Sequence, residues 1–392
     1  MAVQLADVLR RHGPSYVQRH SAAMLPSHRR AMRDIERCRT AELGGHLAEC
    51  AQCGREHLLH HSCGNRACPR CGHEATVAWI ERQRQLLLPV RYYHVVFTLP
   101  EELRRLVRSH QRPLLSVLFQ AAFESFAALC RDPHYLGADI GALAVLHTWT
   151  RTLEWHPHIH MLVPGGGLAP DGRTFVTVPS DRKRYLVPVR ALSAGFRGRF
   201  YRLARRALPG VAIPHIPQDK RWVTFCKPAV QGADKVLDYL GRYVHRTALS
   251  GKAIVAQDDE TVTFLYRRSG QSARRAMRLP AAEFLRRFLQ HVPPKGLHRV
   301  RAFGLLHPSH RPQLRRLQLL LGGPTARDAT PETPTDMWKA AEGQPVKRPS
   351  RLRCRGCGEA LLRPVRRLSA EQCMAWESLS DSAAIERARA PP

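Results

Sequence analysis

Acidic residues are scarce in this chain. Its 392 residues include 32 Asp and Glu against 62 Lys and Arg, which gives a formal net charge of +30. An excess of this size indicates a polyanionic partner. An anionic membrane surface is the alternative, but the basic residues are spread through segments with folding patterns and are not confined to one amphipathic helix. The charge therefore favours nucleic acid.

The sequence also lacks the segments that mark membrane, secreted and ATP-driven proteins. No run reaches the ~18 apolar residues of a membrane span, and residues 1–7 lack the charged region and apolar core of a signal peptide. We therefore expect a cytoplasmic protein, associated with the bacterial nucleoid, whose cysteines are metal ligands and not disulfides. Ser250-Gly251-Lys252-Ala253 lacks the leading glycine and the hydroxyl of a phosphate-binding loop, so we expect no helicase module and no nucleotide cofactor.

Cysteine is abundant between residues 38 and 71. Cys50-Ala-Gln-Cys53 and Cys68-Pro-Arg-Cys71 are two Cys-x-x-Cys pairs, and together they match the spacing of a structural zinc site. Cys38 and Cys63 lie in the same segment, so six cysteines with neighbouring histidines can supply ligands for two ions. Four thiolates leave no open coordination position for chemistry. We therefore predict a structural zinc-binding domain with a face that contacts DNA.

Composition divides the chain into five parts. We expect N-terminal helices, a zinc-binding domain, a catalytic domain, a linker rich in Pro, Thr and Lys, and a tail, over residues 1–37, 38–90, 91–321, 322–350 and 351–392. The tail carries Cys354-Arg-Gly-Cys357, which has three ligands if Cys373 joins it. Zinc binding by this lone pair stays open.

Strand and helix patterns alternate through the middle of the chain. The sequence predicts strands at 92–99, 142–149, 158–163, 221–226, 252–256 and 261–267, and helices at 100–130, 191–207, 233–247, 281–291 and 311–321. Asp258-Asp259-Glu260 has the residue types of an integrase metal site. Adjacent carboxylates between two strands cannot converge on one metal pair, so we predict a turn there.

A second candidate metal site lies in the stretch 155–163. His158 and His160 flank Ile159 at the start of an apolar run. Side chains alternate faces along a strand, so the two imidazoles point the same way while Ile159 faces the core. This arrangement predicts a divalent-metal site, and a third ligand must come from nearby. We assign it to His147 on the neighbouring predicted strand. The alternatives on the same face of the strand are His156 and Glu154.

Two tyrosines lie downstream in the predicted helix 233–247. Tyr239 and Tyr243 are four residues apart and therefore share one helix face. At about 100° per residue, three cations fall beside them: Lys235, Arg242 and Arg246. The tyrosines are candidate nucleophiles for a phosphodiester, although tyrosines at the edge of a core helix would give the same pattern.

A second basic segment, residues 182–206, has nine basic side chains and no acidic one, and the nearest acid, Asp181, directly precedes it. Charged faces that are merely solvated usually mix both signs. We therefore predict a phosphate-binding surface here, with Arg199 and Arg202 among its DNA contacts.

These stretches together resemble the HUH superfamily of single-strand nucleases and, within it, the two-tyrosine rolling-circle transposases of the insertion-sequence-91 family. The matching stretches are Cys38–Cys71, Tyr92–Pro100, Leu146–Trp149, His156–Gly167 and Tyr239–Arg246. They occur in the order that the family has. The resemblance implies an α+β fold, with a ferredoxin-like (RRM-like) nuclease domain whose central antiparallel sheet carries the histidines, preceded by a small zinc-binding domain.

The resemblance also implies a transposase that cleaves and rejoins single-stranded DNA through 5′-phosphotyrosine intermediates. Tyr239 and Tyr243 would be the nucleophiles, and His158, His160 and His147 would bind Mg²⁺ or Mn²⁺, with imidazole ligands favouring Mn²⁺. Its partners would be single-stranded DNA at the element ends and target, and host replication and helicase proteins. A plasmid or phage replication initiator or relaxase shares this nuclease core. A non-catalytic zinc-dependent DNA-binding regulator is an alternative of another class.

Overall fold

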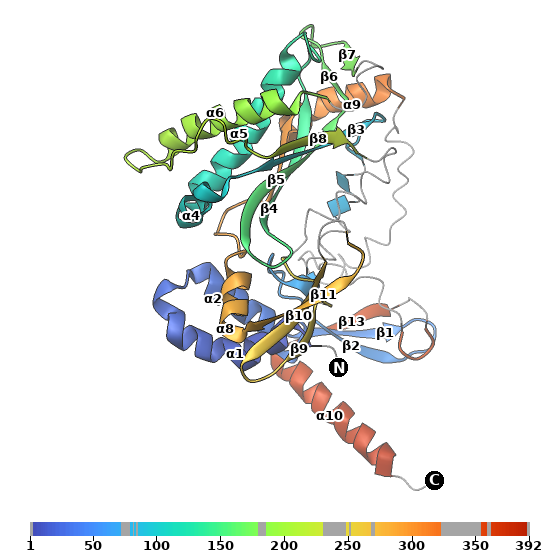
Figure 1. The fold of residues 1–392 in the computed structure, drawn as a ribbon. Helices are drawn as coiled ribbons and strands as arrows, with labels where there is room; N and C mark the ends of the chain where they lie inside the picture. Colours follow the sequence, from blue (N-terminus) through green and yellow to red (C-terminus); the bar gives the residue numbers. More distant parts are fainter. Residues whose placement is uncertain are drawn as a thin grey trace.

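The computed structural model describes residues 3–71, 79–80, 82–83, 85–178, 186–229, 248–250, 252–267, 271–322, 354–358 and 362–389. The predicted tyrosine helix at 233–247 lies outside the described residues, as does most of the predicted linker at 322–350. Figure 1 shows a central sheet with its helices in the upper part of the molecule, and the N-terminal helices with two smaller sheets in the lower part.

The central sheet has five antiparallel strands in the order β12-β4-β5-β3-β8. Along the chain, β3 is followed by helices α4 and α5, then by β4 and β5, and α6 precedes β8. The bounds are β3 Tyr92–Thr98, α4 Glu101–Ser109, α5 Gln111–Arg131, β4 Gly141–Trp149, β5 Trp155–Pro164, α6 Val189–Ala207, β8 Thr224–Pro228 and β12 Val300–Gly304. The sheet confirms the predicted mixed helix-and-sheet architecture with a central antiparallel sheet.

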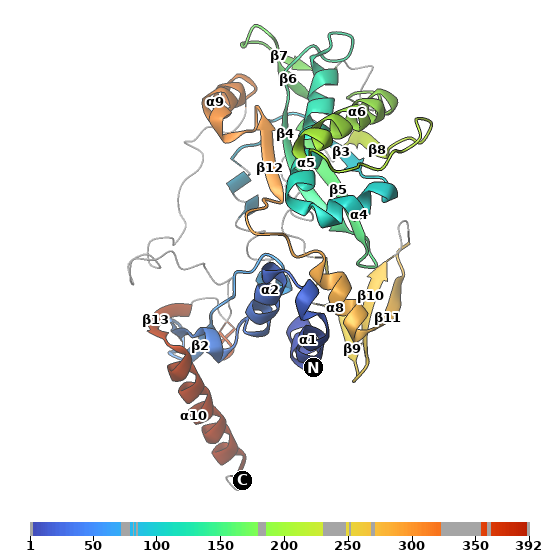
Figure 2. The ribbon, with the colours of Figure 1, turned by 90° about the vertical axis from the view of Figure 1, so that its left-hand side faces the viewer.

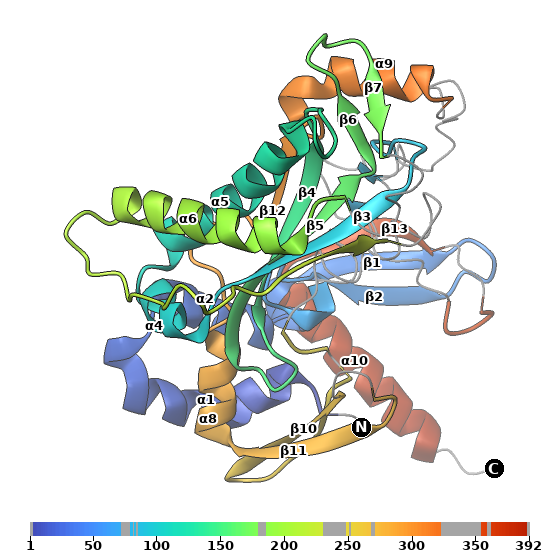
Figure 3. The same cartoon turned by 45° about the horizontal axis from the view of Figure 1, so that its top comes forward.

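One face of this sheet is covered by α5 and α6, which pack against each other (Figure 3). Ile159 and Met161 on β5 are fully buried in the same apolar core as Phe126 of α5 and Phe196 of α6. Because strand side chains alternate, His158 and His160 lie on the opposite face, as the sequence predicts.

Helix α5 bears on the expectation that no segment of the chain spans a membrane. Among the described residues it is the one helix long and apolar enough to cross a membrane by length and composition. Most of its apolar side chains are buried against the sheet, however, including Leu114, Leu118 and Phe126. Its hydrophobicity is that of a core helix covering a sheet.

A second core lies below the sheet. It joins helices α1 (Leu5–His20) and α2 (Pro26–Glu36) to α8 (Ala281–Leu289) and to a sheet of order β11-β10-β9, whose strands are β9 Ile254–Gln257, β10 Thr261–Arg267 and β11 Arg274–Pro280. Helix α1 runs without a break through Gly13-Pro14. A Cβ on Gly13 would lie 3.2 Å from Met32 Cε, so the glycine allows α1 and α2 to approach closely.

The third sheet unites two distant parts of the chain. Its order is β13-β1-β2, with β1 Gly45–Cys50, β2 Glu56–His60 and β13 Leu362–Leu368, and helix α10 (Ala370–Arg389) follows β13. The pairing runs from Gly45 opposite Leu368 to Cys50 opposite Leu362. The segment predicted as a separate tail therefore completes the sheet of the zinc-binding region (Figure 2).

The remaining elements are short. They are the hairpin β6 Gly166–Leu168 and β7 Phe175–Thr177, helix α9 Arg311–Leu320, and 3-10 turns at Ser21–Ala23, Ala41–Leu43 and Pro308–His310. The predicted turn between β9 and β10 is confirmed. Asp258 Oδ1 accepts hydrogen bonds from the backbone N–H groups of Glu260 and Thr261 at 3.0 and 2.7 Å, so this carboxylate closes the turn.

Candidate functional site

Three histidines meet on the face of the central sheet that α5 and α6 leave uncovered. His147 on β4 is directly opposite His158 on β5, and His160 lies two residues further along β5. One ring nitrogen from each lies within 4.8 Å of the others, close enough for the three to hold one metal ion. The structure thus brings together the two histidines of the motif and the third that was assigned from the neighbouring strand.

Backbone and side-chain partners orient these imidazoles. His158 Nδ1 lies 2.6 Å from the carbonyl oxygen of His156, to which it donates, so its Nε2 carries the lone pair. His160 Nδ1 lies 2.9 Å from His94 Nε2 on β3, and the two rings stack with centroids 5.1 Å apart. A hydrogen bond on one ring nitrogen that fixes the other is typical of metal-binding histidines.

Burial keeps the group uncharged. It lowers the pKa of His94 and of His158 to about 4. Burial also lowers the pKa of His160 strongly, and the neighbouring His147, His158 and His94 lower it further. Neutral imidazole is the form that binds metals, so the site is ready for a cation at neutral pH.

His94 is a residue that the sequence reasoning missed. It lies within the predicted strand 92–99, and its partner in the neighbouring strand is Leu162, next to the motif. The sequence could have indicated it. His94 and Val96 are two residues apart and therefore share a face of β3, and Val96 is opposite His160 in the neighbouring strand.

Neither of the two alternative ligands, Glu154 and His156, belongs to the converging group of three histidines. Glu154 is exposed and its carboxylate lies 4.0 Å from Arg287 on α8. The ring of His156 lies 5.2 Å from that of His158, but His156 is not among the three residues whose ligand atoms converge. Burial, followed by the Arg104 cation, lowers the pKa of His156.

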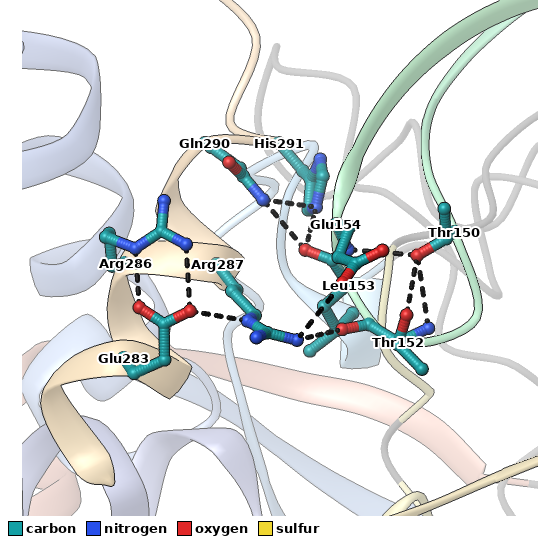
Figure 4. Close-up of polar contacts among 9 residues, drawn as sticks. All are labelled: Thr150, Thr152, Leu153, Glu154, Glu283, Arg286, Arg287, Gln290 and His291. Carbon is teal, nitrogen blue, oxygen red and sulfur yellow. Dashed lines mark hydrogen bonds and ion pairs between the residues drawn. The ribbon is translucent and has the colours of Figure 1, made fainter. Parts of the chain in front are cut away.

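Helix α8 holds the turn that leads into the histidine strand (Figure 4). Leu153 has a left-handed backbone with φ of 63°, and its carbonyl accepts hydrogen bonds from Gln290 Nε2 at 2.8 Å and His291 Nε2 at 3.0 Å. Arg287 donates to the carbonyl of Thr152 at 3.0 Å. These contacts fix the β4–β5 turn, and with it the register that places His147 opposite His158.

Helix α4 places cations beside the same strand. Arg104 lies near His156 and His158, and its Nε is buried without a hydrogen-bond partner among the described residues. Arg108 lies over the ring of Trp155, 5.4 Å from its centroid. A buried guanidinium donor without a partner next to a metal-ligand group suits an anionic ligand such as a phosphate.

Four cysteines form a group inside the second core. Sγ atoms lie 3.5 Å apart for Cys38 and Cys71, and 3.6 Å apart for Cys63 and Cys71 and for Cys68 and Cys38. Ligands at Zn–S distances of about 2.3 Å in a tetrahedron are about 3.8 Å apart, whereas disulfide sulfurs are about 2.05 Å apart. The observed spacing therefore fits a structural zinc site.

Comparison with known proteins gives the family. A family model described as "Transposase zinc-binding domain" matches residues 8–99, and one described as "Putative transposase" matches residues 141–313. The chain is 38% identical over 339 residues to "Putative transposase y4qJ" of Sinorhizobium fredii, covering 81% of this chain and 84% of that protein. It is 31% identical over 303 residues to "Transposase for insertion sequence element IS801" of Pseudomonas savastanoi pv. phaseolicola, covering 70% and 71%.

The chain belongs to the insertion-sequence-91 family of transposases. No solved structure matches it. As a transposase it acts on DNA, which agrees with its net charge of +30. The match to the zinc-binding family model and the group of four cysteines both support zinc binding by this chain.

The ligand pairing in the transposase differs from the one that sequence spacing suggested. Cys50 and Cys53 do not share a site with Cys68 and Cys71. They meet the tail knuckle: Cys50 Sγ lies 3.6 Å from Cys357 Sγ, and Cys53 Sγ lies 3.5 Å from Cys354 Sγ. Sequence spacing was misleading here because β13 folds back along β1 and brings the tail to the end of that strand.

Cys373 is not a ligand in either group. It is fully buried in the small apolar cluster of Ala41, Leu47 and Leu368, and a Cβ on Gly45 would lie 3.2 Å from its Sγ. The third ligand that the sequence left open for the tail pair is therefore not Cys373; Cys50 and Cys53 lie beside that pair instead.

The predicted DNA contacts divide into two sets. The nucleophiles and their cations, Tyr239, Tyr243, Lys235, Arg242 and Arg246, lie outside the described residues. Arg199 and Arg202 lie on α6, in the helical layer on the sheet face opposite to the histidines, and Arg202 contacts Glu124 of α5 at 3.2 Å. The structure therefore does not bring these two arginines to the histidine group.

Proposed function

We propose that this transposase cleaves and rejoins single-stranded DNA through covalent phosphotyrosine intermediates during rolling-circle transposition. The observation that carries the proposal is the convergence of His147, His158 and His160 on one face of the central sheet. The group faces away from the helical layer, so we expect a DNA strand to approach from that side of the sheet.

The connectivity of the sheet supports a ferredoxin-like HUH nuclease domain. Along the chain, strand β3 is followed by helices α4 and α5, strands β4 and β5, helix α6 and strand β8. In the sheet, these four strands lie side by side in the order β4-β5-β3-β8. The histidine motif lies on β5, one of the two inner strands of these four. In such a layout the helices cover one face and leave the other for ligands.

The residues of the three-histidine group would hold Mg²⁺ or Mn²⁺. When bound, the ion would supply Lewis acidity to the scissile phosphate. The chain itself contributes neutral imidazoles, ring orientation through His94 and the His156 carbonyl, and a nearby cation in Arg104 for a phosphate oxygen. Three nitrogen ligands favour Mn²⁺ over Mg²⁺ when both are present.

The sequence motif supports Tyr239 and Tyr243 as nucleophiles. The attacking phenolic oxygen forms a bond to phosphorus, and the bond from phosphorus to the 3′ oxygen breaks. The phenolic proton ends on the departing oxygen, which leaves a 5′-phosphotyrosine and a free 3′-hydroxyl. The reverse reaction rejoins DNA without ATP because the phosphoester bond is conserved. Two tyrosines allow one strand end to be held while the other tyrosine cuts the next site.

The remaining parts supply recognition. The zinc-binding region would contact the element's end and the target, and Lys235, Arg242 and Arg246 would bind the phosphates of the strand at the tyrosines. Because residues 250–253 do not form a nucleotide-binding loop, host replication and helicase proteins would separate the strands at the nucleoid.

A covalent-trapping experiment tests the proposal. Wild-type protein is mixed with a single-stranded oligonucleotide carrying the element's end, with Mn²⁺ or with chelator, and denatured. We expect a protein–DNA adduct in Mn²⁺ alone. The double variant Tyr239→Phe with Tyr243→Phe should bind the oligonucleotide and form no adduct, whereas the control Tyr135→Phe should form it normally.

Each outcome separates one alternative. An adduct in the double variant would refute the nucleophiles, and an adduct in chelator would refute the metal. A protein that binds DNA and never forms an adduct would be a regulator. A replication initiator or relaxase would form the adduct but would fail to join the cut end to a second site.

A further inference from the structure

The second four-cysteine group lies at one end of the β13-β1-β2 sheet. Cys50 is the last residue of β1 and Cys53 follows in the turn to β2, while Cys354 and Cys357 lie in the segment before β13. All four Sγ atoms lie within 4.8 Å of one another. The match to the zinc-binding family model ends at residue 99 and does not reach the second pair.

The two cysteine pairs have the same local structure. The N–H of Gly54 donates to the carbonyl of Cys50 at 2.8 Å, and the N–H of Gly358 donates to the carbonyl of Cys354 at 3.0 Å. Both glycines are left-handed, with φ of 68° and 82°. Each pair is therefore a Cys-x-x-Cys-Gly turn that aims two sulfurs the same way, and the two turns face each other.

The surroundings of Cys354 suit a thiolate. The backbone N–H of Gly356 lies 3.2 Å from its Sγ, and His57 Nε2 lies at the same distance of 3.2 Å. Donors directed at sulfur stabilise its charged form, which is the form that binds metals.

A pair of disulfides fits the geometry less well. The shortest contacts, 3.5 and 3.6 Å, are far beyond the ~2.05 Å of a sulfur–sulfur bond. They are close to the ~3.8 Å edge of a zinc–thiolate tetrahedron.

We propose that Cys50, Cys53, Cys354 and Cys357 bind a second zinc ion, which fastens the C-terminal segment to the N-terminal zinc-binding domain. The ion joins residues 301 positions apart in the chain, Cys53 and Cys354. It closes the sheet at the end where β1 and β13 meet, and so holds β13 and α10 against the N-terminal domain. The proposal goes beyond the cleavage reaction and does not depend on it.

The two zinc sites differ in exposure, which gives a way to tell them apart. Cys38, Cys68 and Cys71 are buried in the second core, whereas Cys53 and Cys357 are exposed. The second ion should therefore exchange with chelators faster than the first.

Metal content of the full chain is the first test. We expect two zinc ions per chain, and one in Cys53→Ser and in Cys357→Ser. Cys373→Ala is the matched control, because this cysteine is in the same region and outside both groups, and it should retain two. One zinc in the wild type, or two in Cys357→Ser, would overturn the proposal.

Thiol labelling of the unmodified protein gives a test that does not depend on variants folding. Exposed free thiols react quickly, so zinc-free Cys53 and Cys357 would be alkylated at once. We expect both to be protected in the native protein and to react first when chelator is added. Immediate alkylation of the zinc-loaded protein would contradict the second site, and protection that only a reductant removes would identify disulfides.

A cut between the two zinc ligand pairs tests the fastening. A protease site is inserted among residues 331–340 of the full chain and cleaved after purification. The C-terminal fragment should remain bound in buffer and separate on chelation, and in Cys53→Ser it should separate without chelator. A fragment that stays bound in chelator would show that strand pairing alone holds it.

Discussion

His147, His158 and His160 lie on two neighbouring strands of the central sheet. The eight clustered cysteines lie at the end of β1, in turns and irregular segments, and in one short helical segment at Cys71. The positions of the histidines are set by strand register, by the hydrogen bond between His94 and His160, and by the contacts of α8 with the β4–β5 turn. None of these contacts involves a metal ion as a partner.

The cysteines are brought together from separate segments of the chain. One group gathers four thiols from a segment of 34 positions, Cys38 to Cys71, and the other gathers them from both ends of the chain. Clustered thiolates repel one another when no cation is present. The difference separates the roles of the proposed metals. At the histidines an ion would supply chemistry in a site that the sheet already positions, and at the cysteines zinc would complete the fold.

The largest effect should come from the histidines. His158→Ala, His160→Ala and His147→Ala should each reduce cleavage of a single-stranded site below detection, because each removes a metal ligand. Melting temperature and zinc content should stay near those of the wild type. The control is His310→Ala, an exposed histidine at the start of α9, which should cleave normally. Loss of cleavage in His156→Ala but not in His147→Ala would mean that the third ligand is wrong.

Loss of a buried cysteine should instead lower zinc content and stability and largely spare cleavage. Cys68→Ser should lose one zinc, and binding free energy on the order of 10 kcal/mol would no longer support the local fold. Recognition of the element's end should weaken, while cleavage of a short preformed single-stranded site should persist at lower affinity. Metal analysis with a cleavage assay measures both. Complete loss of cleavage, with the central sheet still folded, would break the separation of roles.

Substitution of His94, which supports a proposed metal ligand without being one, should have a smaller effect on cleavage. His94→Ala removes the hydrogen-bond partner of His160, and such changes lower metal affinity or activity by about 10- to 100-fold. The expected sign is a shift to higher Mn²⁺ concentration for half-maximal cleavage, partly restored in His94→Gln. A structural role would instead lower cleavage equally at all Mn²⁺ concentrations.

The smallest effect should come from the turn. Gln290→Ala removes one of two hydrogen bonds to the Leu153 carbonyl and should lower the free energy of unfolding by about 1 kcal/mol. Because His291 still holds that carbonyl, cleavage should fall only a few-fold. Denaturant unfolding and a cleavage assay check this, and a loss as large as that of His160→Ala would make the turn part of the site.

Local patterns predicted the central sheet well. Runs of apolar residues located β3, β4 and β5, and the parity of residues 158–160 placed the histidines on one face. Strand adjacency also supported the choice of His147. Local patterns do not predict contacts that strand pairing creates between distant segments. Pairing of β3 with β5 places His94 beside His160, and pairing of β13 with β1 places Cys354 and Cys357 near Cys50.

Several other strands were not predicted from the sequence, for a related reason. Strands β1, β2, β11, β12 and β13 were not predicted, because several are short, polar and rich in arginine, as in Arg274–Pro280. Their burial depends on neighbours far away in sequence and not on their own periodicity. The same dependence made α1 continuous, since contact with α2 stabilises it through Gly13-Pro14.

Hydrogen exchange of the full chain before and after complete removal of metal tests the central claim most directly. We predict that the amides of β3, β4 and β5 keep their protection in the metal-free protein, while those of β1, β2 and β13 lose it. Adding Mn²⁺ alone should leave this pattern unchanged, and adding zinc should restore it. Loss of protection in β3–β5 together with β1, or full protection of β1 and β13 without metal, would contradict the account.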